Sequence, residues 1–252
     1  MRCYWLSLIT LVPVVAMADD LIPPQDVWTG KGQAGYVASQ GNTEARSFNA
    51  AFDAGMLSGA WKHSVHLGGL YGQSSDVVSA ERWDTLWQSN YTFSPDEFVF
   101  GALRYSHDMF SGFEYQGSAS AGYGYKFFNT PTTQLSTQLG VGYRTSRQEL
   151  IVKDDASGAV LYRVPLDITN EAVFTTELDY SHALTGTTTI SNKLLIESGS
   201  SNTSITDAFA LTVKMSQKLA LSAGVNFQDN TKPPAGLKKV DTTETVNLVY
   251  SF

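Results

Sequence analysis

The sequence predicts an all-β protein, a transmembrane antiparallel up-and-down β-barrel of about 12 strands. Hydrophobic residues recur with a period close to two almost everywhere after Val27, which is typical of strands. The alternating segments reach or exceed the roughly 9–11 residues that a tilted strand needs to cross a bilayer, whereas globular strands average about 5–6 residues. The connections alternate between short and long, as they do in bacterial outer-membrane barrels.

The N-terminal segment, MRCYWLSLITLVPVVAMA (residues 1–18), reads as a secretory signal peptide. It has Arg2, an apolar run and an Ala16-Met17-Ala18 cleavage site. An uncleaved anchor is the alternative, but a spanning helix needs about 20 apolar residues and this run is shorter. We expect residues 19–27 to be a loose periplasmic leader and residues 28–252 to be the barrel. The single cysteine, Cys3, would leave with the signal, which excludes disulfides and cysteine-based metal sites from the mature chain.

Composition narrows the class further. The formal charge is −7 with scattered cations, and nucleic-acid binding calls for a basic stripe that this chain lacks. Aromatic residues at 12% and 21 glycines favour strands and turns. No later segment approaches 18 consecutive apolar residues, so we expect no transmembrane helix. No linker divides residues 28–252, which predicts one domain.

The expected strands follow from the alternation, taken segment by segment. They lie at residues 28–40, 44–57, 61–71, 81–93, 98–107, 115–127, 134–146, 168–183, 188–197, 205–215, 219–228 and 242–252. The first connection lies within SQGNTEARSFNAAFDA (residues 39–54). There Gly41 and Asn42 tolerate the left-handed backbone angles of a tight hairpin, while Thr43 and Glu44 keep its tip polar.

The other connections sort by position along the chain. Those after even-numbered strands are tight turns, at residues 57–60, 94–97, 128–133, 184–187 and 216–218. Those after odd-numbered strands are longer and polar, at residues 72–80, 108–114, 147–167, 198–204 and 229–241. Short periplasmic turns and long external loops produce this asymmetry. Within residues 147–167, Ile151, Val152, Val160 and Leu161 are expected to pair as strand extensions around a ribbon tip.

Each strand presents one apolar and one polar face. The apolar set is often aromatic near strand ends, as at Trp83, Trp87, Tyr91, Phe174 and Leu221. Aromatic rings at these positions suit the two interfacial girdles of a membrane barrel. The polar set carries both signs and is expected to face the lumen. Its candidates are Arg82, Asp84, Arg104, Lys126, Arg144, Glu171, Glu177, Asp179, Lys193, Glu197 and Lys214.

The chain end carries a candidate assembly signal. Val246, Leu248, Tyr250 and Phe252 alternate with polar or small residues and finish on an aromatic ring. Such a last strand is similar to the signal read by the barrel assembly machinery of outer membranes. We therefore expect Tyr250 and Phe252 to serve as this signal.

Several motifs together resemble one family. They are Trp28-Thr-Gly-Lys-Gly-Gln-Ala-Gly-Tyr36 followed by Ser39-Gln-Gly-Asn-Thr-Glu44, then Arg104-Tyr-Ser-His-Asp108, Gly122-Tyr-Gly-Tyr125 and Gly140-Val-Gly-Tyr-Arg144. The pattern, from about Trp28 to Phe252, is similar to the YdiY-like, salt-induced outer-membrane proteins, a domain of unknown function. The resemblance implies an outer-membrane barrel, salt-induced in some members and linked to envelope or osmotic stress. It implies no catalytic or ligand residue.

Catalytic chemistry has little support. The candidates for proton transfer near neutral pH are His63, His66, His107 and His182. Ser106 beside His107 looks like part of a hydrolase, but adjacent strand residues point to opposite faces and cannot hydrogen-bond as nucleophile and base. We therefore expect no catalytic, cofactor or metal residues.

Two exposed features have binding alternatives. Asp154 and Asp155 at the ribbon tip would suit a divalent ion that bridges lipopolysaccharide, although acidic turns are usually just solvated. Lys232, Lys238 and Lys239 would suit lipid phosphates, against the same ordinary interpretation of a solvated surface.

The sequence thus predicts a non-enzymatic outer-membrane protein whose role is either structural, with a plugged lumen, or that of a small passive pore. One alternative is an outer-membrane lipid hydrolase, which needs a serine and a histidine that converge on the lipid face. The other is a soluble periplasmic ligand-binding barrel. Expected partners are outer-membrane lipids, lipopolysaccharide and the assembly machinery, with no nucleic acid and no cofactor.

Overall fold

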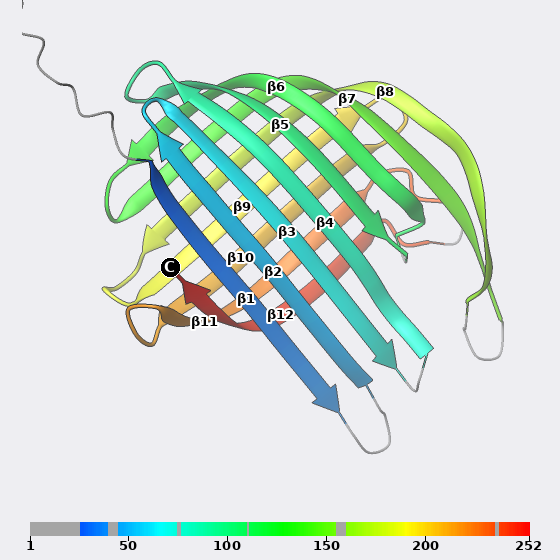
Figure 1. Ribbon diagram of the computed structural model, residues 1–252. Helices are drawn as coiled ribbons and strands as arrows, with labels where there is room; N and C mark the ends of the chain where they lie inside the picture. The colour runs from blue at the N-terminus through cyan, green and yellow to red at the C-terminus, as the bar shows by residue number, and fades with distance from the viewer. Residues whose placement is uncertain (1–25, 40–44, 75–76, 110, 155–159, 235–236) are drawn as a thin grey trace, which may run out of the picture.

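The computed structural model describes residues 26–252 except 40–44, 75–76, 110, 155–159 and 235–236 (Figure 1). The expected signal peptide, nearly all of the leader and the Gly41-Asn42-Thr43 turn lie outside the described residues. Twelve strands make up the fold. They are β1 (Val27–Ser39), β2 (Ala45–Ser58), β3 (Trp61–Ser74), β4 (Val77–Thr92), β5 (Glu97–Asp108), β6 (Phe113–Asn129), β7 (Thr133–Lys153), β8 (Val160–Ala183), β9 (Thr188–Gly199), β10 (Thr203–Lys214), β11 (Leu219–Asn230) and β12 (Val240–Ser251).

The strands form one closed antiparallel barrel. Each strand pairs with its neighbour in sequence, and β12 pairs with β1 to close the ring. All strands are tilted, and the β7–β8 ribbon curves away at one side (Figure 1). The predicted up-and-down barrel is confirmed, including its number of strands.

Polarity across the barrel wall is opposite to that of a soluble protein. Large apolar side chains such as Trp83, Phe174 and Leu221 are exposed on the outside, while Gln138 and Glu177 are buried inside. Period-two alternation produces this division because successive strand residues point to opposite faces. A soluble ligand-binding barrel would bury the apolar face instead, so that alternative does not fit. Among the described residues, no helix is long and apolar enough to cross a membrane.

Aromatic rings cluster toward both ends of the barrel. At the end where β3 and β4 meet the short turns, which we call the turn end, Trp61 and Tyr91 have centroids 4.9 Å apart. Toward the opposite end, the loop end, Trp83 and Tyr105 stack at the same 4.9 Å separation. Two aromatic belts of this kind are typical of transmembrane barrels.

The loop end is more regular than the sequence predicts. Most of the expected loop at residues 72–80 is strand instead, so this predicted loop is too long, whereas the strand extensions expected within residues 147–167 are present. Backbone pairing in water needs no apolar alternation, and polar residues therefore continue the ladders beyond the membrane. The turn end is as predicted, with Gly59 adopting φ = 57° in the β2–β3 turn, a conformation that favours glycine.

The β7–β8 ribbon is the longest extension. Ile151 pairs with Arg163 and Val152 with Tyr162, as expected for strand extensions around the tip. The register shifts between Arg147 and Glu149. This bulge lets the ribbon bend where it leaves the barrel.

Candidate functional site

The inner face of the barrel gathers the polar side chains that could act on a solute. Odd residues of β1, β2, β8 and β9 point inward, as do even residues of β3 to β7, because neighbours in register share a face. Three clusters and one cavity make up the candidate site.

The first cluster is a chain of charges on β1 to β4. Lys31 Nζ lies 3.1 Å from Asp53 Oδ2, and His66 lies 2.6 Å from Asp53 and 3.3 Å from Asp84. Lys31, Asp53 and His66 occupy directly opposed register positions on three strands. Arg82 joins the chain at 3.6 Å from Asp84. Opposite charges at opposed positions stabilise this register.

The second cluster centres on Glu177 of β8. Its carboxylate lies 2.7 Å from Arg104 Nη2 and 3.1 Å from Lys193 Nζ, and Lys193 also lies 3.7 Å from Asp179. Gln138 donates to Glu177 at 3.1 Å and accepts from Gln88 of β4. β5 is not a neighbour of β8, nor β4 of β7, so the Arg104–Glu177 and Gln88–Gln138 contacts reach across the lumen.

The third cluster surrounds Arg144, which is only 1% exposed to solvent. Its guanidinium lies 2.6 Å from Glu171 Oε1 and donates to the backbone carbonyls of Glu197 and Asn202. The Glu171 carboxylate also accepts bonds from Ser201. Each charged group is thus paired and hydrogen-bonded, as burial of a charge requires.

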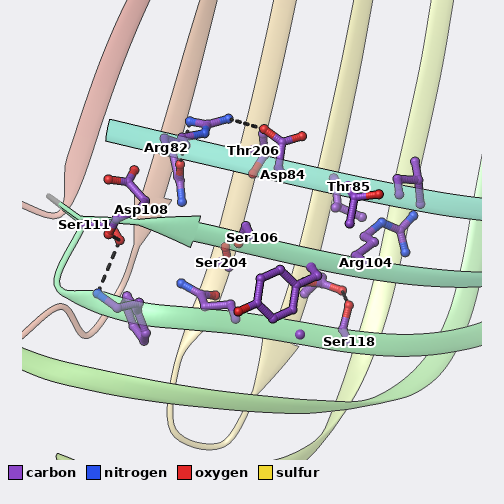
Figure 2. Close-up of a pocket in the computed structure, with 18 of the residues that line it drawn as sticks. Arg82, Asp84, Thr85, Arg104, Ser106, Asp108, Ser111, Ser118, Ser204 and Thr206 are labelled. Atoms are coloured by element: carbon purple, nitrogen blue, oxygen red, sulfur yellow. Dashed lines mark hydrogen bonds and ion pairs between the residues drawn. The ribbon is translucent and has the colours of Figure 1, made fainter. Parts of the chain in front are cut away.

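A cavity of about 200 Å³ lies between these clusters. Its lining combines cations, carboxylates and hydroxyl groups from opposite walls of the barrel (Figure 2). The lining residues labelled in Figure 2 are Arg82, Asp84, Thr85, Arg104, Ser106, Asp108, Ser111, Ser118, Ser204 and Thr206. Figure 2 shows Arg82 and Asp84 joined on one strand, with Arg104 on the next. Such a surface offers donors and acceptors to a small hydrophilic solute.

Connections at the loop end narrow the cavity mouth. Arg163 of the β7–β8 ribbon pairs with Glu149 and donates to the Met109 carbonyl. The Glu149 N–H donates to Gly112 O at 2.9 Å. Gly112 has φ = 76° and no room for a Cβ beside Leu237. The ribbon, the β5–β6 turn and the β11–β12 connection are therefore held together over one side of the mouth.

Aromatic packing fills part of the lumen toward the turn end. Phe98 and Phe100 of β5 are buried on the inner face and form an apolar cluster with Ala102 and Leu86. A Cβ at Gly124 would overlap the Phe98 ring, and one at Gly140 would lie 2.9 Å from Phe100 Cζ. Glycines on β6 and β7 thus give the two rings their space. The inner wall is packed on this side of the barrel.

The sequence-predicted candidates separate into two groups. Most of them lie in the three clusters, namely Arg82, Asp84, Arg104, Arg144, Glu171, Glu177, Asp179, Lys193 and Glu197. Lys126 and Lys214 stay outside them. Lys126 sits over the Phe98 ring at 5.8 Å, and Lys214 is exposed at the end of β10.

The end of β12 closes the ring. Tyr250 and Phe252 are exposed on the outer face. Gly30 of β1 exchanges two backbone hydrogen bonds of 3.0 Å with Phe252, whose ring covers this glycine.

Sequence reasoning missed the inward phenylalanines, Gln138 and Asn202. It assigned aromatic rings to the outer face only. The glycines opposite Phe98 and Phe100 in the neighbouring strands carry a usable signal, because inner glycines leave room for large rings. Asn202 gave no such signal, since its bonds to Asn230 and to the Lys232 N–H join the β9–β10 connection to the end of β11 and the residues after it.

The remaining sequence hypotheses gain no binding site. Ser106 lines the cavity, whereas His107 packs beside Trp83 on the outer face, so the two do not meet. Asp155 lies outside the described residues. Lys232 donates to Ser200 O at 3.1 Å. Within the described part of the chain, no three His, Cys, Asp or Glu residues are placed to hold a metal ion.

Comparison with known proteins gives a family and several barrels. The family model described as "Protein of unknown function, DUF481" matches residues 32–252. Uncharacterized protein YdiY of Escherichia coli (strain K12) is 25% identical over 250 residues, which cover 95% of this chain and 89% of YdiY.

Two solved structures are similar in overall form. The translocator domain of autotransporter NalP from Neisseria meningitidis is 13% identical, with a TM-score of 0.44 over 90% of this chain and 87% of that domain. The COG4313 outer membrane channel from Pseudomonas putida F1 is 7% identical, with a TM-score of 0.46 over 90% and 95% of the two chains. The fold assignment rests on the strand pairing described above.

Proposed function

Since the chain belongs to the family described as protein of unknown function, DUF481, we propose its role from the barrel itself. The proposed role is a small, passive and weakly selective pore in an outer membrane. One observation carries this proposal: charged inner side chains on β1, β2, β8 and β9 are accessible to water. Lys31 is 47% exposed, Asp53 36%, Asp179 46% and Lys193 43%. A plugged lumen would bury such groups.

Weak selectivity follows from the charges. Among the described residues, the cations of the inner face lie close to carboxylates, as at Arg104–Glu177 and Lys31–Asp53. A ring of one sign would favour ions of the opposite sign, whereas compensated pairs leave little net field. The hydroxyl groups of Ser106, Ser204 and Thr206 around the cavity suit uncharged hydrophilic solutes equally well.

Conductance in a planar bilayer tests this role. The purified protein is first shown to be folded by its heat-modifiable migration on gels. It should then give discrete current steps with a cation-to-anion permeability ratio near unity. Lys31→Glu should shift that ratio toward cations, because it replaces an ammonium with a second carboxylate beside Asp53. Lys126→Glu is the matched control, since Lys126 lies outside the charged clusters, and it should change the ratio less. Folded protein without current steps would identify a structural barrel instead.

The cellular location and the link to envelope or salt stress form part of the same proposal. Family resemblance supports an outer-membrane location and a role in envelope or salt stress. Cell fractionation should place the protein with outer-membrane lipids and lipopolysaccharide. A deletion strain should show altered growth at high salt, and complementation should restore it. Unchanged growth across salt concentrations would remove the stress link and leave the pore proposal standing.

Assembly supplies the proposed protein partner. Tyr250 and Phe252 would be read by the barrel assembly machinery, and their exposure on the outer face supports this role. Tyr250→Ala should lower the yield of assembled barrel in cells while leaving refolding in detergent intact. Equal loss in both settings would assign Tyr250 to stability alone.

A second candidate function, lipid hydrolysis, is favoured by one specific observation. Ser89 Oγ lies 2.9 Å from His63 Nδ1, and both residues occupy opposed positions on the outer face of β3 and β4. Gly101, paired with Ser89 on β5, has open space where a side chain would lie. A serine beside a histidine is the minimal arrangement for nucleophilic attack on an ester.

The pair lacks the rest of a hydrolase site. His63 stacks on Trp61 at 5.8 Å, and no described carboxylate is paired with its ring. Orientation of the imidazole by a third group is part of efficient hydrolases. Purified protein in phosphatidylethanolamine vesicles should therefore release no fatty acid. Release that Ser89→Ala abolishes, with the barrel still folded, would establish the second function in place of a passive role.

A further inference from the structure

The junction between β1 and β12 is paired over a much shorter length than any other. Its register runs only from Lys31↔Ser251 to Ala34↔Leu248, with Gly30 and Phe252 continuing it at the turn end. Every other pair of neighbouring strands is in register over at least 11 residues. In Figure 1, β1 and β12 run together near the C mark and diverge beyond it. The ring therefore closes at the turn end only.

Both strands continue past the point of divergence. Residues 35–39 of β1 keep their partners on β2, and residues 240–247 of β12 keep theirs on β11. Within the described chain, neither stretch has a register partner across the junction. Unpaired strand edges are not tolerated in contact with hydrocarbon, because their N–H and C=O groups have nothing to bond. Water or a polar group must therefore reach this gap, which we call the seam.

A hydrogen bond between two asparagine side chains marks the point where the seam begins. Asn247 of β12 accepts a 2.7 Å hydrogen bond from Asn49 Nδ2 of β2, and it does so across Gly35 of β1. A Cβ at Gly35 would overlap the Asn247 side chain and the Val246 carbonyl. Glycine at this position thus lets β12 approach β1, with open strands beyond it.

A second cavity of about 190 Å³ lies on the lumen side of the same region. Asp241, Thr242 and Thr243, three of its lining residues, belong to the stretch of β12 that has no partner on β1. Arg82 and Asp108 line both this cavity and the first one. The seam therefore leads toward the hydrophilic lumen.

We propose that the seam is a lateral portal, through which amphiphiles with a primary ammonium head group pass between the membrane and the lumen. Acidic groups surround the path. Glu244 is exposed on the outer face of β12, and the cavity wall holds Glu81, Asp108 and Asp241. These four carboxylates outnumber the nearby cations, Arg82 in the cavity wall and Lys238 close to Asp241. An anionic head group would be repelled from this path.

Hydrogen-bonding demand selects a head group that donates. Asn226 Oδ1 in the cavity wall is buried and accepts no hydrogen bond. The free edges of β1 and β12 add carbonyl acceptors beside their own N–H donors. A primary ammonium carries three donors, whereas a quaternary ammonium has none. On the outer face, exposed Tyr36 and Val246 flank the seam with apolar surface for an alkyl chain.

The test uses a photoreactive dodecylamine probe and a cross-link over the seam in lipid vesicles. Tyr36→Cys/Val246→Cys is joined either by a disulfide or, where the strands stay apart, by a short bis-maleimide. The matched control is Ala34→Cys/Leu248→Cys, positions that are already paired. Heat-modifiable migration establishes that both variants are folded. Labelling of residues 35–39 and 240–247 should fall at least tenfold on bridging the first pair and stay unchanged with the second.

The chemistry of the head group has its own controls. Dodecyltrimethylammonium and dodecyl sulfate probes should label the seam at least fivefold less than dodecylamine does. Glu244→Gln should reduce dodecylamine labelling. Equal labelling after bridging, or equal labelling by all three probes, would overturn the portal. A strand of another polypeptide found cross-linked in the seam would also overturn it.

The portal and the pore fail separately. Bridging the seam should leave the steps of ion conductance in place, because ions follow the lumen. Absence of conductance steps in the unbridged protein, together with amphiphile labelling that bridging suppresses, would reject the pore alone.

Discussion

At the scale of single residues, charged side chains are stable inside the barrel because ion pairs and hydrogen bonds compensate for their loss of water. Arg144 is almost fully buried and bonds to Glu171 and to two backbone carbonyls. Removal of one partner of a buried pair leaves an uncompensated charge, which costs about 3–5 kcal/mol. Exposed pairs such as Lys31–Asp53 stabilise by about 0–1 kcal/mol because water screens them.

Glu171→Gln should therefore lower the free energy of unfolding by about 3 kcal/mol. Asp53→Asn should change it by less than about 1 kcal/mol. Urea titration of the refolded protein in vesicles, followed by heat-modifiable migration, measures both. Equal losses in the two variants would show that the burial of Arg144 does not determine how much its ion pair with Glu171 stabilises the barrel.

The inner phenylalanines predict a second contrast between glycines. Gly124→Ala should destabilise by about 1–3 kcal/mol, because the new Cβ overlaps the buried Phe98 ring. Gly101→Ala is the control and should stay within about 0.5 kcal/mol, since open space surrounds that position on the outer face. The same unfolding titration reads both, and a larger loss at Gly101 would contradict the packing described here.

At the scale of elements, the sequence predicts the strands and their faces but not their loop ends. A membrane-spanning strand must alternate apolar and polar residues. This alternation predicts that Trp83 and Phe174 face outward, as they do. Beyond the membrane the ladder needs no apolar face. The continuation of β3 to Ser74 therefore leaves no comparable signal.

The β7–β8 ribbon carries the element-scale prediction. Its Glu149 and Arg163 hold the β5–β6 turn beside the cavity mouth. Replacement of residues 149–163 by a two-residue turn should raise single-channel conductance on the order of twofold, because the mouth loses its cover. Replacement of residues 154–158 alone, which spares that contact, should leave conductance unchanged. A shortened ribbon with wild-type conductance would show that the mouth is not the narrow point.

At the scale of the whole molecule, contacts between distant segments escape sequence reasoning. The mixed charges of the lumen are recognisable from strand parity. Their grouping around Glu177 depends on which strands face each other across the ring. The seam depends on the register between β1 and β12, at opposite ends of the chain. Lys126 and Lys214 have the right parity, but they lie near strand ends at the turn end, away from the clusters.

The inverted polarity of the barrel is the central claim, and site-directed spin labelling tests it most directly. Nitroxides at Phe174 and Leu221 should collide with oxygen dissolved in the bilayer, and nitroxides at Lys31 and Asp179 with a water-soluble nickel chelate. The opposite pattern, with the first pair wetted by water and the second in hydrocarbon, would contradict the account.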